Sequence, residues 1–379
     1  MRRSTPPAQP AAAQRARLLP LPLPSEFPAA WASAYGEDRH GLWQAFEVAG
    51  VRQVMRWIPP GQFLMGSPKT EPGRWDFEHQ HRVRLTQGFW LADTACTQAL
   101  WLAVLGGKNP SGFNDDAQNP VEQVSWTDVV EVFMPRLNAL VPELNARLPT
   151  EAQWEFACRG DAADNTPFWF GREIGSEQVN FNGTEPSPGA TKSAYRKRTV
   201  PVTALPCNAW GLYQMHGNVW EWCADWYDKY PAEAVENPTG PGKQPSETAG
   251  RVLRGGSWIY GARYCRSALR NVNVPGRRND DFGFRLARGL PPAQPAGGAR
   301  PAEPGAPQAR GFEPQARDPG DGAPGSAGRL SPPGEIGFFQ GAVRAVQKIL
   351  SPADKPPPPG PKPPPPPPPQ PPPKTPRKK

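Results

Sequence analysis

Two stretches early in the chain have the apolar pattern and the turn residues that are typical of β-strands. Residues 54–66 are mostly apolar and are interrupted by Pro59-Pro60-Gly61, which predicts two strands joined by a turn. Residues 82–86 alternate between polar and apolar side chains, as a strand with one buried face would. The first part of the core is therefore expected to contain β-sheet.

Three later segments have helical spacing and a capping side chain at the start. We expect helices over 97–105 with Thr97 as N-cap, over about 127–140, and from Thr150 onward. A helical lead-in is expected over 25–51, where apolar residues form a stripe: Trp31, Tyr35, Leu42, Trp43 and Phe46. After these helices the chain is rich in turn formers, so the fold class is α+β with many loops.

Composition divides the chain into a foldable core and two biased ends. The 379 residues include 54 prolines, which concentrate outside the core. The expected organisation is a disordered segment 1–24, the helical lead-in 25–51, one domain 52–289, a disordered linker 290–336, an amphipathic helix 337–351 and a polyproline, basic tail 352–379. The tail is a candidate ligand for aromatic-groove domains.

Charge and cysteine content narrow the functional classes. The net charge of +8 comes partly from the basic end of the chain, so we expect no specific nucleic-acid partner. Five cysteines without a CxxC pair, together with the absence of a secretion signal or a membrane-spanning run, predict a cytoplasmic protein with reduced thiols.

Seven motif blocks occur in a characteristic order across the core. They are 63–66 (FLMG), 120–126 (PVEQVSW), 147–155 (RLPTEAQWE), 208–213 (NAWGLY), 217–222 (GNVWEW), 254–258 (RGGSW) and 283–287 (GFRLA). The ordered set resembles the formylglycine-generating enzyme (sulfatase-modifying factor) family. That resemblance implies a loop-rich variant of the C-type lectin fold, in which tryptophans supply large apolar bodies with one donor each.

The resemblance also implies a structural calcium ion. Its ligands would be the Gln214 side chain, the carbonyls of Gly217 and Val219, and the Glu221 carboxylate, an oxygen set that suits calcium. A second calcium site of the family would use Asn180 and Phe181 with a later acidic residue. Here residues 193–198 hold no carboxylate, so we expect that site to be lost.

The catalytic equipment of the family is incomplete in this chain. The enzymes use two cysteines to hold copper(I), and these positions fall on Tyr260 and Cys265. A phenol is a poor ligand for copper(I), so copper is not expected, and we expect Cys265 to be a plain buried thiol or a partner of another core cysteine. His79 and His81 lack an acidic partner and read as surface residues, whereas His216 reads as structural.

Residues 259–282 alternate between a fixed frame and changeable positions. The frame is Cys265-Arg266-Ser267-Ala268, Arg270, Pro275 and Arg278, leading to Gly283-Phe284-Arg285. The changeable positions, hereafter the slots, can each be reached from an AAC codon by changing its adenines: Ile259, Tyr260, Gly261, Tyr264, Leu269, Asn271, Val272, Asn273, Val274, Gly276, Arg277, Asn279, Asp280, Asp281 and Phe282.

This pattern resembles the variable region of proteins diversified by retroelements, which change surface residues of the same lectin-like scaffold. Tyr260, Tyr264 and Phe282 would be aromatic anchors, and Asn and Asp adaptable contacts. The first hypothesis is a non-enzymatic protein that binds a macromolecular or small ligand at 259–282. The alternatives are an oxidase acting on a cysteine of a client protein, and an adaptor that acts through its proline-rich tail.

Overall fold

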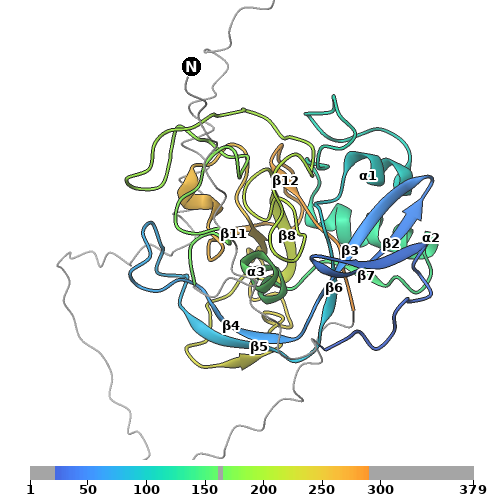
Figure 1. Cartoon of the computed structure of the whole chain (residues 1–379), viewed down its shortest axis with the longest axis horizontal. Helices are drawn as coiled ribbons and strands as arrows, with labels where there is room; N and C mark the ends of the chain where they lie inside the picture. The colour runs from blue at the N-terminus through green and yellow to red at the C-terminus, as the bar shows by residue number, and fades with distance from the viewer. Residues whose placement is uncertain (1–21, 161–164, 290–379) are drawn as a thin grey trace, which may run out of the picture. The chain divides into compact units, whose positions relative to one another are not determined.

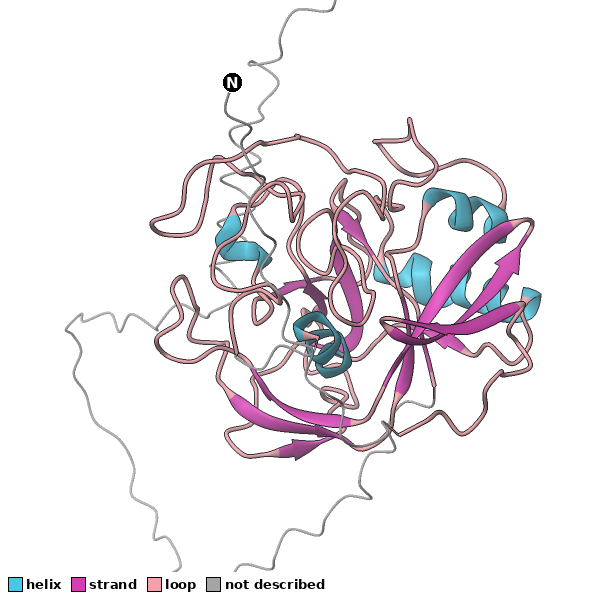
Figure 2. Ribbon diagram, viewed as in Figure 1, coloured by secondary structure: helices cyan, strands magenta, loops and turns pink. Residues whose placement is uncertain are grey.

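Three small sheets, linked by long loops and a few short helices, make up the folded part of the chain (Figure 1, Figure 2). The structure is a computed structural model that describes residues 22–160 and 165–289. The predicted linker, the helix at 337–351 and the tail at 352–379 lie outside these residues. Within the described ranges, no helix combines the length and apolar character needed to cross a bilayer.

The largest sheet joins the start of the domain to its end. Its strands, in spatial order, are β1 (Ala34–Asp38), β2 (Gly41–Val48), β3 (Val51–Ile58), β6 (Phe89–Ala92), β13 (Ala287–Arg288) and β7 (Ala146–Arg147). β13 pairs antiparallel with β6 on one side and with β7 on the other. The last described strand therefore ties together segments that are far apart in sequence.

The expected helical lead-in over 25–51 is wrong, because β1 and β2 form a hairpin there. Gly41 turns the chain with a φ of 104°, a conformation that glycine adopts readily. β2 then pairs along its length with β3, and Phe46 becomes fully buried in the core. The same aromatic residues fit a helical stripe or a strand face, and pairing with β3 decided between them.

The strands expected over 54–66 and 82–86 all form: the first is β3 of the largest sheet, and the others belong to a second sheet. β4 (Gly61–Met65), β5 (His81–Leu85) and β9 (Val235–Glu236) form a three-stranded sheet. β11 (Arg270–Asn273), β10 (Arg251–Arg254), β8 (Trp220–Trp226) and β12 (Phe282–Gly283) form a four-stranded sheet. Two of its strands overlap the window 259–282: β11 contains the slots Asn271, Val272 and Asn273, and β12 contains Phe282, so this sheet carries four of the fifteen slots.

The predicted helices are present, with one local departure. Helix α1 (Gln98–Leu105) begins at Thr97, and α3 (Glu151–Arg159) begins with a capping box between Thr150 and Gln153. The helix expected over 127–140 starts as a π-helical segment, η1 (Asp128–Phe133), and continues as α2 (Met134–Leu140). A 3₁₀ turn, η2 (Ala262–Cys265), lies within the slot-bearing window.

Buried tryptophans hold the loop-rich core together, as their number suggests. Trp154, Trp220 and Trp222 are each at most 1% exposed. The indole N–H of Trp154 donates to the Glu221 carboxylate, and that of Trp222 donates to the Val124 carbonyl. These bonds link α3 and the loop at Val124 to β8, so the indoles of Trp154 and Trp222 supply apolar volume and satisfy polar groups at once.

Candidate ligand-binding surface

Five arginines anchor the window 251–285 to the rest of the domain, and we call them the arginine frame. Arg266 meets Glu71 and Glu78, Arg270 meets Glu151, and Arg278 meets Asp128. Arg254 pairs with Glu155, and Arg285 forks onto Glu221. Arginine suits this role because its planar fork matches a carboxylate in two parallel bonds. The frame residues at 266, 270, 278 and 285 are those that the sequence pattern marked as fixed.

Most of the frame is inaccessible to solvent, and the charges are compensated there. The side chains of Arg270 and Glu151 are only 2% and 5% exposed, and two hydrogen bonds of 2.6 and 2.8 Å join them. The neighbouring charge of Arg270 helps to lower the pKa of Glu151, although burial opposes the shift. Removing either partner of such a buried pair would strongly destabilise the fold, because the remaining charge would be left unpaired.

The slots fall into two groups once their exposure is known. Ten slots keep at least part of their surface in solvent: Ile259, Tyr260, Tyr264, Val272, Asn273, Val274, Gly276, Arg277, Asn279 and Asp280. Val274 is the most open of the large apolar ones, at 50% exposed. These ten, hereafter the displayed slots, can contact a ligand without any rearrangement of the domain.

The remaining five slots are buried, and for them the expectation of ligand contact is wrong. They are Gly261, Leu269, Asn271, Asp281 and Phe282. Leu269 and Phe282 belong to the main apolar cluster, and the Phe282 ring meets Trp222 edge-on. A Cβ at Gly261 would lie 2.6 Å from the side chain of Glu185. Codon compatibility does not report burial, which is why the sequence pattern did not separate these five.

Two of the three predicted aromatic anchors are accessible and lie together. The rings of Tyr260 and Tyr264 are 4.9 Å apart, and Tyr260 also meets Trp220 edge-on at 5.7 Å. Both tyrosines extend from the turn around η2, which Arg266 ties down through Glu71 and Glu78. A pair of ordered rings on a fixed turn costs little conformational entropy when a ligand binds.

Sequence reasoning missed three aromatic residues that extend this surface. Trp258 contacts Phe113 edge-on at 5.2 Å and stacks near Tyr195 at 6.4 Å, and its indole N–H donates to the carbonyl of Asp280. Phe113 and Tyr195 are partly exposed and come from loops far from the window in sequence. Only Trp258, which directly precedes the first slot, carried a signal that could have identified it.

Two buried acidic residues, Asp281 and Glu122, lie near the displayed slot Asp280. Asp281 accepts hydrogen bonds from Ser257 at 2.7 Å and from Asn279 at 2.5 Å. Burial raises the pKa of Asp281 to about 7, and the neighbouring charge of Asp280 adds to the shift. Burial likewise raises the pKa of Glu122 to about 7. Asp281 therefore supports the loop that displays Asn279 and Asp280, and does not itself reach solvent.

The two positions that correspond to copper ligands do not form a thiolate pair. Tyr260 packs on aromatic rings, and Cys265 is fully buried as a free thiol. Burial raises the pKa of the Cys265 thiol to about 12, which opposes formation of the thiolate that copper(I) requires. The residues present therefore do not fit the two-cysteine copper site of the resembling enzymes.

The calcium ligand set fits only in part. The Oε1 atom of Gln214 is buried without a hydrogen-bond partner, as a cation ligand would be, while its Nε2 donates to the Pro201 carbonyl. By contrast, both carboxylate oxygens of Glu221 accept hydrogen bonds from Arg285 at 2.7 Å. Arg285 already neutralises the one carboxylate in the set, which weakens the attraction for a divalent cation.

Of the three histidines weighed in the sequence, His79 is exposed as expected, whereas His216 and His81 are buried. His216 is buried and contacts the carbonyl of Cys265 through Nδ1, and burial lowers its pKa to about 3, in keeping with the structural role expected for it. His81 was expected at the surface, but it is 5% exposed and its ring lies 4.7 Å from that of Tyr230. His81 is the first residue of β5, and its contact with the distant Tyr230 is one that sequence spacing does not reveal.

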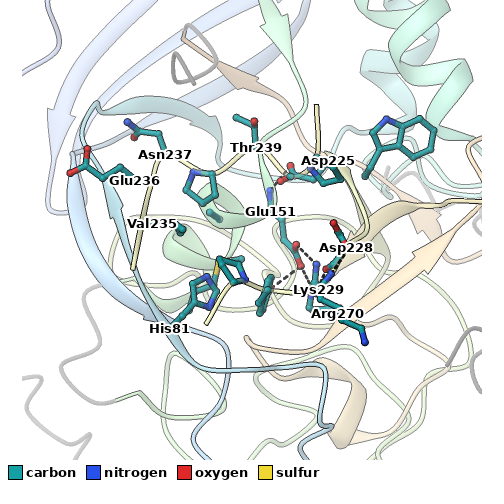
Figure 3. Close-up of a pocket in the computed structure, with 18 residues that line it drawn as sticks. His81, Glu151, Asp225, Asp228, Lys229, Val235, Glu236, Asn237, Thr239 and Arg270 are labelled. Atoms are coloured by element: carbon teal, nitrogen blue, oxygen red, sulfur yellow. Dashed lines mark hydrogen bonds and ion pairs between the residues drawn. The ribbon is translucent and has the colours of Figure 1, made fainter. Parts of the chain in front are cut away.

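A cavity of about 380 Å³ lies beside β5, β9 and the start of α3, and no slot lines it (Figure 3). Glu151, at its floor, is held by Arg270 and by the Tyr230 hydroxyl. Burial raises the pKa of the adjacent Asp225 to about 7. The charge of Glu151 in this cavity is therefore compensated by Arg270, a residue of the arginine frame.

Comparison with known proteins agrees with the motif order. The model of the sulfatase-modifying factor enzyme 1-like domain matches residues 44–290. A formylglycine-generating enzyme of Thermomonospora curvata is 33% identical over 234 residues, covering 58% of this chain and 74% of that protein. One of Streptomyces coelicolor is 36% identical over 200 residues, covering 49% of this chain and 60% of that protein.

The fold of the chain also resembles that of a solved structure that carries a different description, a variable protein. Treponema denticola variable protein 1 superposes with a TM-score of 0.53 and 26% identity, covering 65% of this chain and 98% of that one. Its fold agrees with the lectin-like, loop-rich architecture expected from the motifs. Since the family model covers more than half of the chain, this protein belongs to the sulfatase-modifying factor enzyme 1-like domain family.

Proposed function

We propose that the chain is a non-catalytic binding protein whose displayed slots contact a protein or another macromolecular ligand. The observation that carries this proposal is the separation within 259–282 between buried, ion-paired arginines and partly exposed slots. A rigid frame with changeable side chains on it lowers the ordering cost of binding and allows the contacts to vary without loss of the fold.

Two further observations support diversification of this surface. Every slot is compatible with adenine changes in an AAC codon, and the structural neighbour with a TM-score of 0.53 is described as a variable protein. Tyr260 and Tyr264 form a pair of adjacent rings, and the buried Trp258 donates a hydrogen bond to the carbonyl of Asp280, another displayed slot. Such a mixture of ordered rings and short polar groups is typical of adaptable binding surfaces.

Oxidase activity is not part of the proposal. The replacement of one copper-binding position by Tyr260, and the burial of Cys265, remove the paired thiolates that the chemistry needs. We expect the purified protein to take up no stoichiometric copper(I), and Cys265→Ser to leave this unchanged. Copper bound at one equivalent by the wild type and lost in Cys265→Ser would instead favour the oxidase.

A structural calcium ion remains a proposal that rests on Gln214. If the unpaired Oε1 of Gln214 binds the ion, with the carbonyls of Gly217 and Val219 beside it, calcium should raise the melting temperature. The rise should disappear in Gln214→Leu, which has a similar volume but no carbonyl. If neither calcium nor chelators change the melting temperature of the wild type, the proposal of a structural calcium ion is contradicted.

The experiment that tests the proposed function is deep sequencing of codons 259–282 across a growing population. We expect substitutions at the slots and none at Arg266, Arg270, Pro275 or Arg278. Among the slots, the displayed ones should carry most of the accepted changes, because changes at the buried five disturb packing. A uniform sequence throughout the window would contradict a diversified surface.

A further inference from the structure

A second cavity, of about 430 Å³, lies where β6 begins and β13 ends, and none of residues 259–282 lines it. Its walls come from the segment before β1, from β3 and β6, and from the residues around β7 and β13. A volume of this size accommodates a small organic molecule. The cavity is therefore separate from the ligand-binding surface proposed above.

Arg147 gives this cavity an unsatisfied hydrogen-bond donor. Its Nε donates to the Gly289 carbonyl at 2.8 Å, and one terminal nitrogen donates to the Leu148 carbonyl and to Gln153 at 2.8 and 2.9 Å. Its other terminal nitrogen is buried and has no partner among the described residues. An unpaired buried guanidinium N–H is costly, and an acceptor in the cavity would remove that cost.

The contrast with the arginine frame shows what Arg147 lacks. Arg254, Arg266 and Arg270 each pair with a carboxylate, whereas the oxygens that meet Arg147 belong to uncharged carbonyl and amide groups. Burial lowers the pKa of Arg147 to about 10, with only the charge of Asp225 opposing the shift. The guanidinium stays protonated at neutral pH, so an anionic acceptor would suit it better than a neutral one.

Other charges near the cavity are mixed. Arg288 lines it from β13 with its guanidinium over the Trp31 ring, and the carboxylates of Glu26 and Glu143 act on its charge. Glu26 lines the cavity as well. The positive charge of Arg288 is thus partly compensated, and preference for an anion rests on Arg147.

The cavity is also lined by aromatic residues. Trp57, Phe89 and Trp90 line the cavity, and the rings of Trp57 and Trp90 are 5.3 Å apart. A Cβ on Gly88 would lie 2.3 Å from the Trp57 ring, so glycine lets the indole rest against the backbone. Phe89 and Trp90 are buried, so an aromatic or aliphatic body would pack on the partly exposed Trp57 ring while its charged end met Arg147.

From this geometry we infer that the cavity binds a small organic carboxylate with an aromatic body, its carboxylate on the free N–H of Arg147 and its ring against Trp57. This is a binding site additional to the displayed slots. It requires no part of the proposed diversification, so either idea can fail without the other.

The test is ligand-observed NMR and calorimetry on the full chain with 3-phenylpropionate as the probe. Its neutral analogue 3-phenylpropionamide has the same shape without the charge. We expect the acid to bind at least tenfold more tightly than the amide. Arg147→Gln should abolish that preference, while Arg263→Gln, which removes an exposed arginine elsewhere, should preserve it.

Because Arg147 also holds Gly289 and Leu148, the fold of each variant must be checked by circular dichroism. If Arg147→Gln does not fold, Trp57→Leu is the second variant. It should weaken binding of 3-phenylpropionate at least fivefold. Equal affinity for acid and amide, or affinity unchanged in a folded Arg147 or Trp57 variant, would overturn the inference. So would failure of the acid to bind, which would mean that water or the chain's own residues satisfy Arg147.

Discussion

The arginine frame and the displayed slots share one segment of about thirty residues but differ in almost every physical property. Arg270 is buried and joined to Glu151 by two hydrogen bonds, whereas Val274, four residues later, is half exposed. The frame residues reach carboxylates on distant elements; the displayed slots face outward from turns between them. Stability and variability can therefore be assigned to alternate positions of the same loop, provided that buried charges are paired.

Breaking the frame should have the largest effect. Arg270→Ala removes the partner of Glu151 and leaves that carboxylate buried, so we expect the free energy of unfolding to fall by about 3–5 kcal/mol. Urea denaturation measures the loss, and Arg277→Ala, at a displayed slot, is the matched control. A loss below 1 kcal/mol for Arg270→Ala would mean that the frame does not hold the window in place.

Two glycine slots, the buried Gly261 and the exposed Gly276, test the division of the slots by burial. Gly261→Ser should cost about 1–3 kcal/mol, because a Cβ there would lie 2.6 Å from Glu185. Gly276→Ser should be nearly neutral, since nothing lies within 4 Å of its added Cβ. Thermal melts of the two variants measure the difference; equal melting temperatures would contradict the division of the slots by burial.

Asp281 tests whether a buried slot acts as part of the scaffold. Its pKa of about 7 in the folded state exceeds the ordinary value of 3.8, so its contribution to stability is present at low pH and is lost as pH rises towards 7. Asp281→Asn should remove this dependence and stabilise the protein at pH 8 by on the order of 1 kcal/mol. Unfolding free energies at pH 5 and pH 8 provide the test; a variant that is less stable at pH 8 would contradict it.

Arg278 should show the smallest effect on stability. Its side chain is 57% exposed, and its pair with Asp128 is worth about 0.2–1 kcal/mol at such a position. Arg278→Ala should instead speed hydrogen exchange at Thr127 and Gln123, whose amides bond to Pro275 and Asn279. Unchanged exchange at both amides would show that the loop needs no such anchor.

Local patterns in the sequence were sufficient where short-range chemistry decides the structure. The capping residue Thr150 and the alternation over 82–86 both predicted the elements that form. The lead-in at 25–51 failed because its aromatic residues fit either period until β3 paired with β2. Codon compatibility marked Leu269 and Phe282 as displayed, although both are core residues, because it carries no information about depth.

The sequence by itself determined the family, the order of the motifs and the positions of the fixed arginines, because motif order and residue type are properties of the chain. Tertiary structure decided which carboxylate meets each arginine, which slots reach solvent, and that Arg147 keeps a free donor. These depend on contacts between segments that lie up to about two hundred residues apart, such as Arg266 with Glu71. Burial and ion pairing at such separations arise only when the sheets bring the segments together.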